Sequence, residues 1–235
     1  MCFEEKLNWL FQRNRINGKY DFGLLFGSFD DLSMKTLGEQ LLDTFSAMFT
    51  PTHEETDAFV ALATPFEFSS KERIVDEHSF DKVFYLTDGM ARSYIVNSGK
   101  DYTVDFFTKG QFILDWDSFD KNIPSVYQYE TIFPMKGYFW HRKDIQAYLR
   151  VYPHLKKCRR FFAEAAYIRQ AHRLIAFQSD ALKDRYRNLI QNHGKLINTA
   201  PQYHIASYLG VKPQSLSRIK TALLNNKDGK DEVEN

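Results

Sequence analysis

The residues best suited to specific recognition lie near the C-terminal end of the sequence. Gln214, Ser217 and Arg218 follow one another at spacings of three and one, which places them on one face of a helix. Glutamine, serine and arginine carry the donors and acceptors that read base edges in the major groove of DNA. We therefore take a DNA-contacting helix as the candidate site, with these residues as its candidate members: Lys212, Gln214, Ser215, Ser217, Arg218 and Thr221.

A helix–turn–helix is the element that would hold these side chains outward. Ile205 and Leu209 lie one helical turn apart, and Ala206 is small enough for a second helix to cross closely. Gly210 permits a left-handed turn that a side chain would resist. The other inner positions are apolar, as the motif requires: Val211, Leu216, Ile219 and Leu223. This agreement favours the motif, and an ordinary helical hairpin stays the alternative.

The residues around the motif predict where its helices begin. Thr199 and Gln202 have the spacing of a capping box, and Pro201 fits the first turn of a helix. Pro213 fits the first turn of the second helix in the same way. The sequence therefore predicts a first helix that is capped by Thr199.

Charge divides the chain into an acidic part and a basic part. The net charge is only +1, but residues 1–141 hold 13 Lys and Arg against 22 Asp and Glu. Residues 142–220 hold 16 against 4, and residues 221–235 hold 2 against 4. A basic segment suits a phosphate-rich partner because neutralising phosphates releases counterions. A solvated basic helix face is the alternative for the charge pattern alone.

The first half of the chain changes from a helical to a strand pattern. Apolar spacing predicts helices over 35–49 and 52–62, the second opened by a capping box of Thr52 and Glu55. Alternating apolar segments separated by glycine-containing turns then predict short strands typical of a sandwich or barrel. These strands are expected over 83–86, 91–96, 102–107, 112–116, 126–133 and 137–141.

The second half of the chain is predicted to be helical. Helices are expected over 144–151, 154–179 and 180–191, the last ending at Gly194. The long helix repeats apolar residues at spacings of three and four, which is typical of a seam against a twin helix. Its length favours a homodimer over packing on the chain's own domain. The candidate dimer residues are Phe161, Ala165, Ile168, His172 and Ile175.

These features together resemble the Crp/Fnr superfamily, the catabolite-activator and fumarate-nitrate-reductase regulators. The resemblance covers about residues 35–223 and is strongest in HIASYLGVKPQSLSRIK. A second stretch, YLTDGMARSYIVNSGKDYTVDFFTKGQFI, is similar to that family's β-roll, with turn glycines at Gly89, Gly99 and Gly110. The resemblance implies an α+β fold: an N-terminal cyclic-nucleotide-binding-like β-roll or jelly roll, a long dimerisation helix and a C-terminal winged helix-turn-helix. It also implies that Gln214, Ser217 and Arg218 read bases.

The chain departs from that family in the effector pocket. Family members that bind cyclic nucleotides hold the ribose with a glutamate and the phosphate with an arginine. Here Asp115 stands at the glutamate position and Ser125 at about the arginine position, and no arginine occurs between Arg92 and Arg142. Asp115 and Ser125 are therefore the candidate effector residues. We expect an effector other than a cyclic nucleotide, or none.

Other chemistries find little support in the sequence. Cys2 and Cys158 lack a nearby cysteine, so unpaired reduced thiols are expected rather than a cluster or a disulfide. His78 is the only histidine between His53 and His141, and the His pair of a cupin metal site is therefore missing. No serine lies in a GxSxG elbow. We expect no catalytic residue, no metal and no cofactor. His172 is expected to be a packed histidine.

The sequence predicts four segments. These are a weakly ordered extension over 1–33, a β-roll sensor over 34–152, a dimerisation helix over 153–179 and a winged helix-turn-helix over 180–235. No apolar run reaches the length of a membrane span and no signal peptide is evident, so a cytoplasmic location is expected.

Two functions remain open. The first is a bacterial-type, sequence-specific DNA-binding transcription regulator without catalytic activity. Its expected partners are double-stranded DNA with a palindromic operator and a second copy of the chain, with RNA polymerase and an unknown small-molecule effector as further candidates and no membrane. The second is a β-roll protein that binds a small molecule and uses its C-terminal helices only for assembly.

Overall fold

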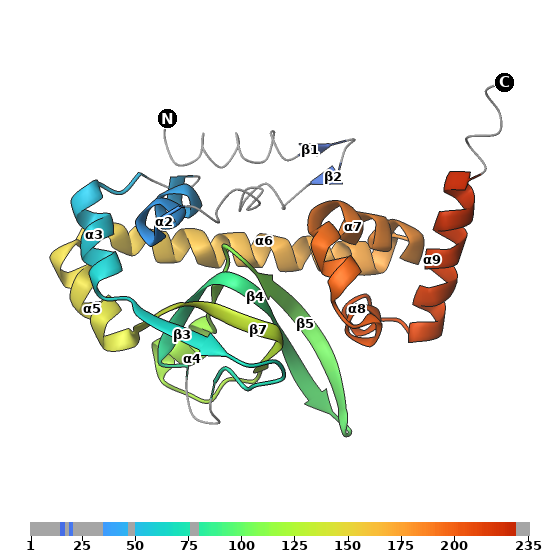
Figure 1. Cartoon of the computed structure of the whole chain (residues 1–235), viewed down its shortest axis with the longest axis horizontal. Helices are drawn as coiled ribbons and strands as arrows, with labels where there is room; N and C mark the ends of the chain where they lie inside the picture. The colour runs from blue at the N-terminus through green and yellow to red at the C-terminus, as the bar shows by residue number, and fades with distance from the viewer. Residues whose placement is uncertain (1–14, 17–18, 21–34, 47–49, 76–79, 229–235) are drawn as a thin grey trace. The chain divides into compact units, whose positions relative to one another are not determined.

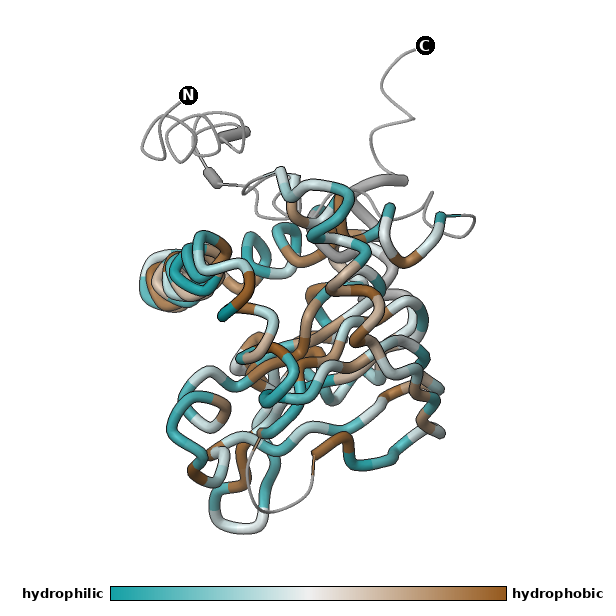
Figure 2. The backbone as a smooth tube through the Cα atoms, turned by 90° about the vertical axis from the view of Figure 1, so that its left-hand side faces the viewer, coloured by the Kyte–Doolittle hydropathy of each residue, from teal (hydrophilic) through white to brown (hydrophobic). Residues whose placement is uncertain are grey.

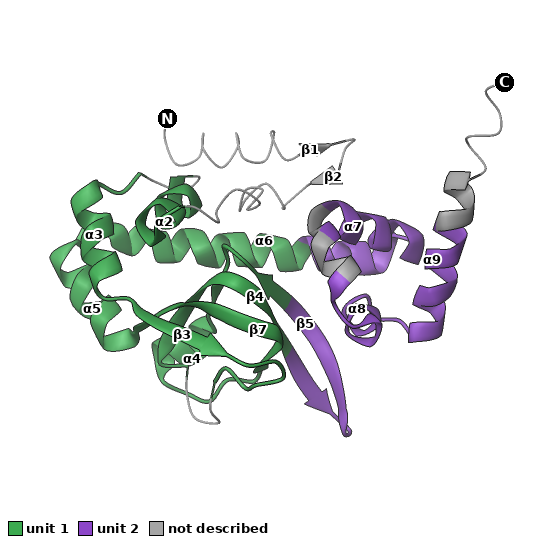
Figure 3. Cartoon of the chain, in the orientation of Figure 1, with its two compact units in different colours: residues 1–93, 106–171 green, residues 94–105, 172–235 purple. Residues whose placement is uncertain are grey.

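The computed structural model describes residues 15–16, 19–20, 35–46, 50–75 and 80–228 (Figure 1). It is an α+β fold, as predicted. Contacts divide the chain into two compact units (Figure 3). Unit 1 contains residues 1–93 and 106–171, and unit 2 contains residues 94–105 and 172–235. The strands β4 (Lys82–Asn97) and β5 (Lys100–Thr108) and the helix α6 (Lys157–Ser179) therefore contribute residues to both units. The sequence boundaries at 152 and 179 do not coincide with this division.

An antiparallel sheet forms the centre of unit 1. Its strands run in the order β3-β7-β4-β5, and β6 also pairs with β4. Thr64 pairs with Phe139 across β3 and β7, and Phe84 pairs with Ile113 across β4 and β6. The described strands form an open path and not a closed barrel. They are β3 (Thr64–Phe68), β4 (Lys82–Asn97), β5 (Lys100–Thr108), β6 (Phe112–Ile113) and β7 (Gln128–His141).

The sheet buries a hydrophobic cluster on each face because successive side chains of a strand point to opposite sides. Phe84 belongs to one cluster, which also contains Phe80, Leu86 and Met135. The next residue, Tyr85, belongs to the other cluster, with Leu41 and Trp140. Hydrophobic and hydrophilic segments alternate along the chain (Figure 2).

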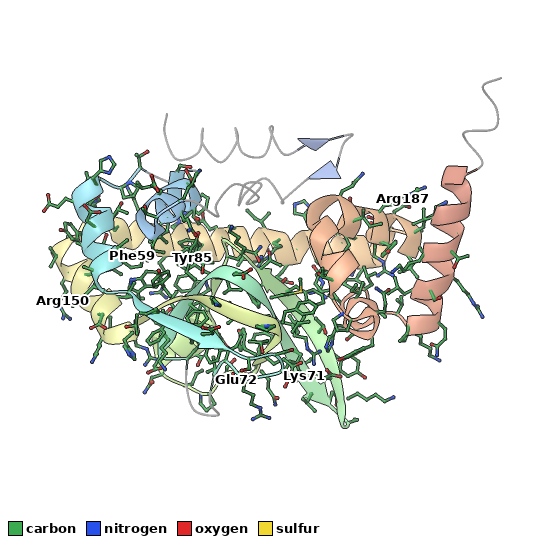
Figure 4. The ribbon with its side chains drawn as sticks, viewed as in Figure 1. Phe59, Lys71, Glu72, Tyr85, Arg150 and Arg187 are labelled. Atoms are coloured by element: carbon green, nitrogen blue, oxygen red, sulfur yellow. The ribbon has the colours of Figure 1, made fainter. Side chains whose placement is uncertain are left out.

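Helices cover the Tyr85 side of the sheet. Phe59 on α3 stacks on Trp140 at 4.5 Å between ring centroids and accepts a hydrogen bond from the Trp140 indole at its carbonyl, 2.7 Å. Phe59 and Tyr85 lie on neighbouring elements of this core (Figure 4). The ring of Phe162 on α6 packs against the ring of Phe112, with 5.7 Å between the ring centroids, so the first part of α6 is held to unit 1. The helices of unit 1 are α2 (Leu37–Ser46), α3 (His53–Ala61), α4 (Trp116–Lys121), α5 (Arg142–Val151), a 3-10 helix (Pro153–Lys156) and the first part of α6 (Lys157–Ser179).

Unit 2 combines helices with the end of one β-hairpin. The hairpin is the 94–105 part of β4 and β5, joined by the two-residue turn Ser98–Gly99, where both residues have positive φ. This matches a type I′ hairpin turn. The helices are the end of α6, α7 (Leu182–Thr199), α8 (Gln202–Tyr208) and α9 (Pro213–Asp228).

Several predicted boundaries are wrong. The two strands predicted on either side of Gly89 form the single strand β4, because Gly89 is a distortion inside it with φ +89°. A Cβ there would lie 2.2 Å from the Pro134 carbonyl oxygen, so only glycine allows β7 to pass this closely. β7 likewise continues through Pro134. In the helical half, α7 continues through Gly194 to Thr199.

Two other predictions concern the ends of the chain. A wing, which is a β-hairpin beside the helix-turn-helix, was predicted after residue 180. Among the described residues, α7 leads directly to α8, and α9 runs to Asp228 without a following strand. The predicted extension over 1–33 lies outside the described residues, except for the paired β1 (Arg15–Ile16) and β2 (Lys19–Tyr20). None of the helices in the described part of the chain is long and apolar enough to cross a membrane.

Candidate nucleic-acid interface

The predicted helix-turn-helix is present as α8, a tight turn and α9. The amide of Gly210 donates to the Ser207 carbonyl at 3.0 Å, and the amide of Val211 donates to the Ala206 carbonyl at 2.9 Å. This pair of bonds is the Schellman pattern that ends a helix, and it requires a left-handed residue at its centre. Gly210 supplies that residue with φ +68°. The turn therefore depends on the glycine that the sequence analysis singled out.

The inner faces of α8 and α9 are buried against each other and against unit 2. Ile205 and Ala206 are fully buried on α8, and Leu216 is almost fully buried on α9. Leu209 is buried at the end of α8. The other predicted inner residues, Val211, Ile219 and Leu223, are half-buried. The apolar pattern therefore describes the packing of the motif correctly.

The candidate DNA-binding residues lie where a ligand could reach them. Lys212, Gln214, Ser217, Arg218 and Thr221 are all exposed. Helical spacing places the last four on one face of α9, opposite the buried Leu216. The sixth candidate is nearer the inner side: Ser215 is half-buried. The arrangement offers an exposed row of polar side chains with one arginine.

The predicted capping box of α8 is wrong. α7 runs through Thr199, and α8 begins at Gln202 with Pro201 in the capping position and no side-chain cap. The first intrahelical bonds of α8 run to the Pro201 carbonyl, which accepts from the amides of His204 at 3.0 Å and Ile205 at 3.2 Å. The two helices are thus separated only by Ala200 and Pro201.

The two candidate effector residues, Asp115 and Ser125, lie together and are hydrogen-bonded to each other. Ser125 Oγ donates to Asp115 Oδ2 at 2.5 Å. The other oxygen, Asp115 Oδ1, accepts from the amides of Asp117 and Ser118 at 3.1 and 3.3 Å, so Asp115 is the N-cap of α4. The carboxylate is buried with these partners. Asp115 therefore acts first as a helix cap.

The segment from Asp115 to Ser125, which we call the effector cassette, has two cations in or beside it that form ion pairs within the chain. Lys121 pairs with Asp117 at 3.1 Å, and Arg159 on α6 pairs with Asp120. Arg142 also lies beside α4, although its position in the sequence does not indicate this. Its guanidinium donates to the Phe80 carbonyl at 2.8 Å and to Asn122 Oδ1 at 2.6 Å. Only the tertiary structure could reveal that position.

The described residues do not form a reactive-cysteine site or a metal site. Cys158 is a free thiol, and burial raises its pKa to about 11, which disfavours the reactive thiolate. Cys2 lies outside the described residues. No group of three potential metal ligands occurs in the parts of the chain that the structure describes. His172 is half-buried on α6.

The candidate dimer helix, α6, presents an apolar stripe to solvent. Tyr167 is 74% exposed, Leu174 60% and Ile175 57%. Helical spacing places Tyr167 and Leu174 on one line. The predicted seam is rotated from this line: Phe161 is buried inside unit 1, and Ala165, Ile168 and His172 are half-buried. Ile175 follows Ile168 by seven residues, so it continues the predicted seam, and it is the member of that seam that is exposed.

The chain is similar in structure to several solved proteins. No family model matches the chain, and no curated protein matches it. FixK2 from Bradyrhizobium japonicum is similar at 18% identity and a TM-score of 0.57, covering 70% of this chain and 86% of that chain. A CooA mutant from Carboxydothermus hydrogenoformans is similar at 12% identity and a TM-score of 0.56, covering 79% and 84%. The c-di-GMP-responsive regulator CLP from Xanthomonas campestris is similar at 11% identity and a TM-score of 0.51, covering 75% and 93%.

The chain has the Crp/Fnr fold. The resemblance noted in the sequence is thereby confirmed at the level of fold. The sheet of unit 1 lies in the segment that was predicted as the sensor, and the helix-turn-helix of unit 2 lies in the segment that was predicted to bind DNA; both roles stay predictions.

Gly210→Ala tests whether the left-handed turn fixes the interface. A side chain at φ +68° costs about 1–2 kcal/mol, and its Cβ would lie 2.8 Å from Cε1 of Phe177. We expect a lower free energy of unfolding, measured by urea denaturation, and weaker DNA binding. Gly99→Ala is the matched control, because Gly99 also has positive φ but a Cβ there meets nothing within 4 Å. Equal losses in both variants would mean that contact with Phe177 contributes nothing.

Proposed function

We propose that this protein is a Crp/Fnr-type, sequence-specific DNA-binding transcription regulator without catalytic activity. The observation that carries the proposal is the exposed polar face of α9 beside a fully buried inner face. Gln214, Ser217 and Arg218 project from a helix that is fixed by Leu216, which is the geometry needed to enter a major groove. The basic balance of residues 142–220 supports a phosphate-rich partner.

A homodimer on a palindromic operator is the form that we propose. α6 leaves the large apolar side chains of Tyr167, Leu174 and Ile175 in water, and a second α6 would bury them in a two-fold seam. Two copies related by two-fold symmetry would present two α9 helices to half-sites about one helical turn, roughly 10 bp, apart. RNA polymerase stays a candidate partner, and the cytoplasmic location stays an expectation.

The second candidate is a small-molecule-binding protein whose C-terminal helices only assemble copies. An assembly helix would expose apolar side chains, as α6 does. α9 instead exposes glutamine, serine and arginine. The composition of α9 therefore favours nucleic-acid recognition over assembly.

For the effector, we propose a ligand other than a cyclic nucleotide, or none. A cyclic nucleotide carries a fixed negative charge that must be paired with a cation when it is buried. The carboxylate of Asp115 and the hydroxyl of Ser125 already bond to each other, and Ser125 brings no charge. A ligand at this cassette would have to displace that bond.

Arg218→Ala tests direct base reading. Loss of one arginine that contacts a base should cost about 1–3 kcal/mol on a site selected from random DNA and relax preference at one base pair. Binding to random DNA should change little. Gel shifts with both DNAs measure the difference. Arg187→Ala is the charge-matched control, since Arg187 is an exposed arginine on α7 (Figure 4).

Two results would contradict this assignment. Equal loss on selected and random DNA would limit Arg218 to phosphate contact. Failure of the unmodified protein to select any sequence from the random pool, at low salt and at physiological salt, would overturn the proposed function itself.

Leu174→Glu tests the dimer. A carboxylate in each copy at a shared apolar seam would be buried without a cation, which costs several kcal/mol. Sedimentation should show a monomer with an unchanged circular dichroism spectrum. Val151→Glu is the matched control, because Val151 is also an exposed apolar residue, 70% accessible, but lies on α5. A dimeric Leu174→Glu variant would exclude this face of α6.

Titration calorimetry with cyclic AMP and cyclic GMP tests the effector pocket. We expect no saturable binding at micromolar concentrations, because an unpaired buried phosphate costs several kcal/mol and each 1.4 kcal/mol is tenfold in affinity. A protein known to bind cyclic nucleotides, measured in the same buffer, controls the assay. Micromolar binding of either nucleotide would refute this view of the cassette.

A further inference from the structure

The end of the β4–β5 hairpin is packed into the same compact unit as the helix-turn-helix. Residues 94–105 group with α7, α8 and α9 and not with the remainder of their own strands (Figure 3). Tyr94 and Thr103 are buried there, whereas the turn Ser98–Gly99 is exposed. The hairpin end therefore has a contact surface on the helices.

Arg173, on the last part of α6, joins this hairpin to α8. One terminal nitrogen of its guanidinium donates to the Val104 carbonyl on β5. The other donates to the Tyr208 carbonyl on α8 at 2.9 Å. The guanidinium carbon also lies 4.1 Å from the centre of the Tyr208 ring and 5.4 Å from that of Phe177. A single side chain thus contacts the strand, the helix and the residue that lies beneath the turn.

A second bond joins the same two elements. The backbone amide of Thr103 on β5 donates to Ser207 Oγ on α8 at 2.9 Å. Thr103 and Val104 are adjacent, as are Ser207 and Tyr208. The strand and the helix are therefore held at two neighbouring points, by one direct neutral hydrogen bond and by the two charged hydrogen bonds that Arg173 donates.

Arginine is chemically suited to this position. The Tyr208 carbonyl is in the last turn of α8, where carbonyls lack intrahelical partners and the helix dipole attracts a cation. The planar guanidinium can donate to two separate carbonyls and stack on a ring at the same time, which a lysine ammonium cannot do in one geometry. The ordinary alternative is an arginine that contacts a DNA phosphate. Arg173 is half-buried and already donates to two carbonyls.

We propose that Arg173 is a positioning residue of the DNA-binding unit and that the 94–105 hairpin end is a structural part of that unit. By fixing the end of α8 to β5, Arg173 sets the direction in which α8 enters the turn at Gly210, and with it the orientation of α9. Residues 103 and 104 on the strand thereby contribute to DNA affinity without touching DNA. This inference rests on the proposed function for its effect on DNA, but its structural part can be tested without DNA.

The first experiment measures hydrogen exchange of the full-length, DNA-free protein. Arg173→Ala should raise exchange at the backbone amides of 94–105 and 202–210 together, on the order of tenfold, because local opening of either segment loses the same contact. Ser207→Ala should raise exchange at the Thr103 amide, whose acceptor it removes. Arg187→Ala, which removes a positive charge from α7, should leave both segments unchanged.

The second experiment measures DNA affinity as a function of salt for the same variants. A phosphate contact contributes about one unit to the slope of log affinity against log salt concentration. A positioning residue does not. We therefore expect Arg173→Ala to bind a selected site about tenfold more weakly with an unchanged salt slope. Arg173→Lys should recover little affinity, since it restores the charge but not the planar fork that donates to both carbonyls while it stacks on the Tyr208 ring. Ser207→Ala should show a smaller loss of the same kind, without any change of charge.

The outcomes separate the two levels of the proposal. Unchanged exchange in both segments for Arg173→Ala and Ser207→Ala would overturn the positioning role. A salt slope reduced by about one, together with full recovery by Arg173→Lys, would also overturn it and assign Arg173 to a phosphate. If Arg173→Ala raises amide exchange in both segments but the unmodified protein selects no DNA sequence, the structural link between hairpin and helix is supported and the proposed function is refuted. If Arg173→Ala does not fold, the neutral Ser207→Ala variant decides by the Thr103 amide.

Discussion

The left-handed turn at Gly210 is the constraint on which the candidate interface depends. It ends α8 after two turns and redirects the chain so that α9 can cross it with Leu216 buried. It also allows the ring of Phe177 to approach the backbone where a Cβ would be. Because the turn lacks a side chain, α6, α8 and α9 can meet closely in one place. The polar face of α9 is exposed as a consequence of that packing.

Hydrogen bonds and ion pairs within the chain also hold the segment from Asp115 to Ser125, where an effector site was predicted. Asp115 accepts two amides and one hydroxyl, Lys121 pairs with Asp117, and Arg142 donates to main-chain carbonyls. Each bond stabilises α4 or its surroundings. A ligand would therefore compete with interactions that already hold this region.

The sequence predicts correctly those features that depend on residues close together in the chain. The helix-turn-helix, its glycine and its buried face follow from spacing within about twenty residues. The predicted boundaries at Gly89, Gly194 and Thr199 are wrong, because glycine and threonine are common stop or start signals but tertiary packing continues the element through them here. The link between Arg173, Val104 and Tyr208 could not be predicted, since it joins segments 69 and 35 residues apart. The rotation of the exposed stripe on α6 was missed for a related reason: a heptad pattern gives period but not which face the domain buries.

Part of the proposed dimer surface belongs to the same compact unit as the polar face of α9. Leu174 and Ile175 on α6 lie in unit 2 together with α9, whereas Tyr167 lies in unit 1 (Figure 3). A two-fold contact through Leu174 and Ile175 would therefore fix the separation of the two α9 helices, and half-site spacing would follow from the packing of a single unit. Arg173 is adjacent in sequence to Leu174 but faces away from the stripe, toward β5 and α8. One short stretch of α6 would then serve both purposes: its outer side joins the copies, and its inner side sets the orientation of the helix that reads DNA.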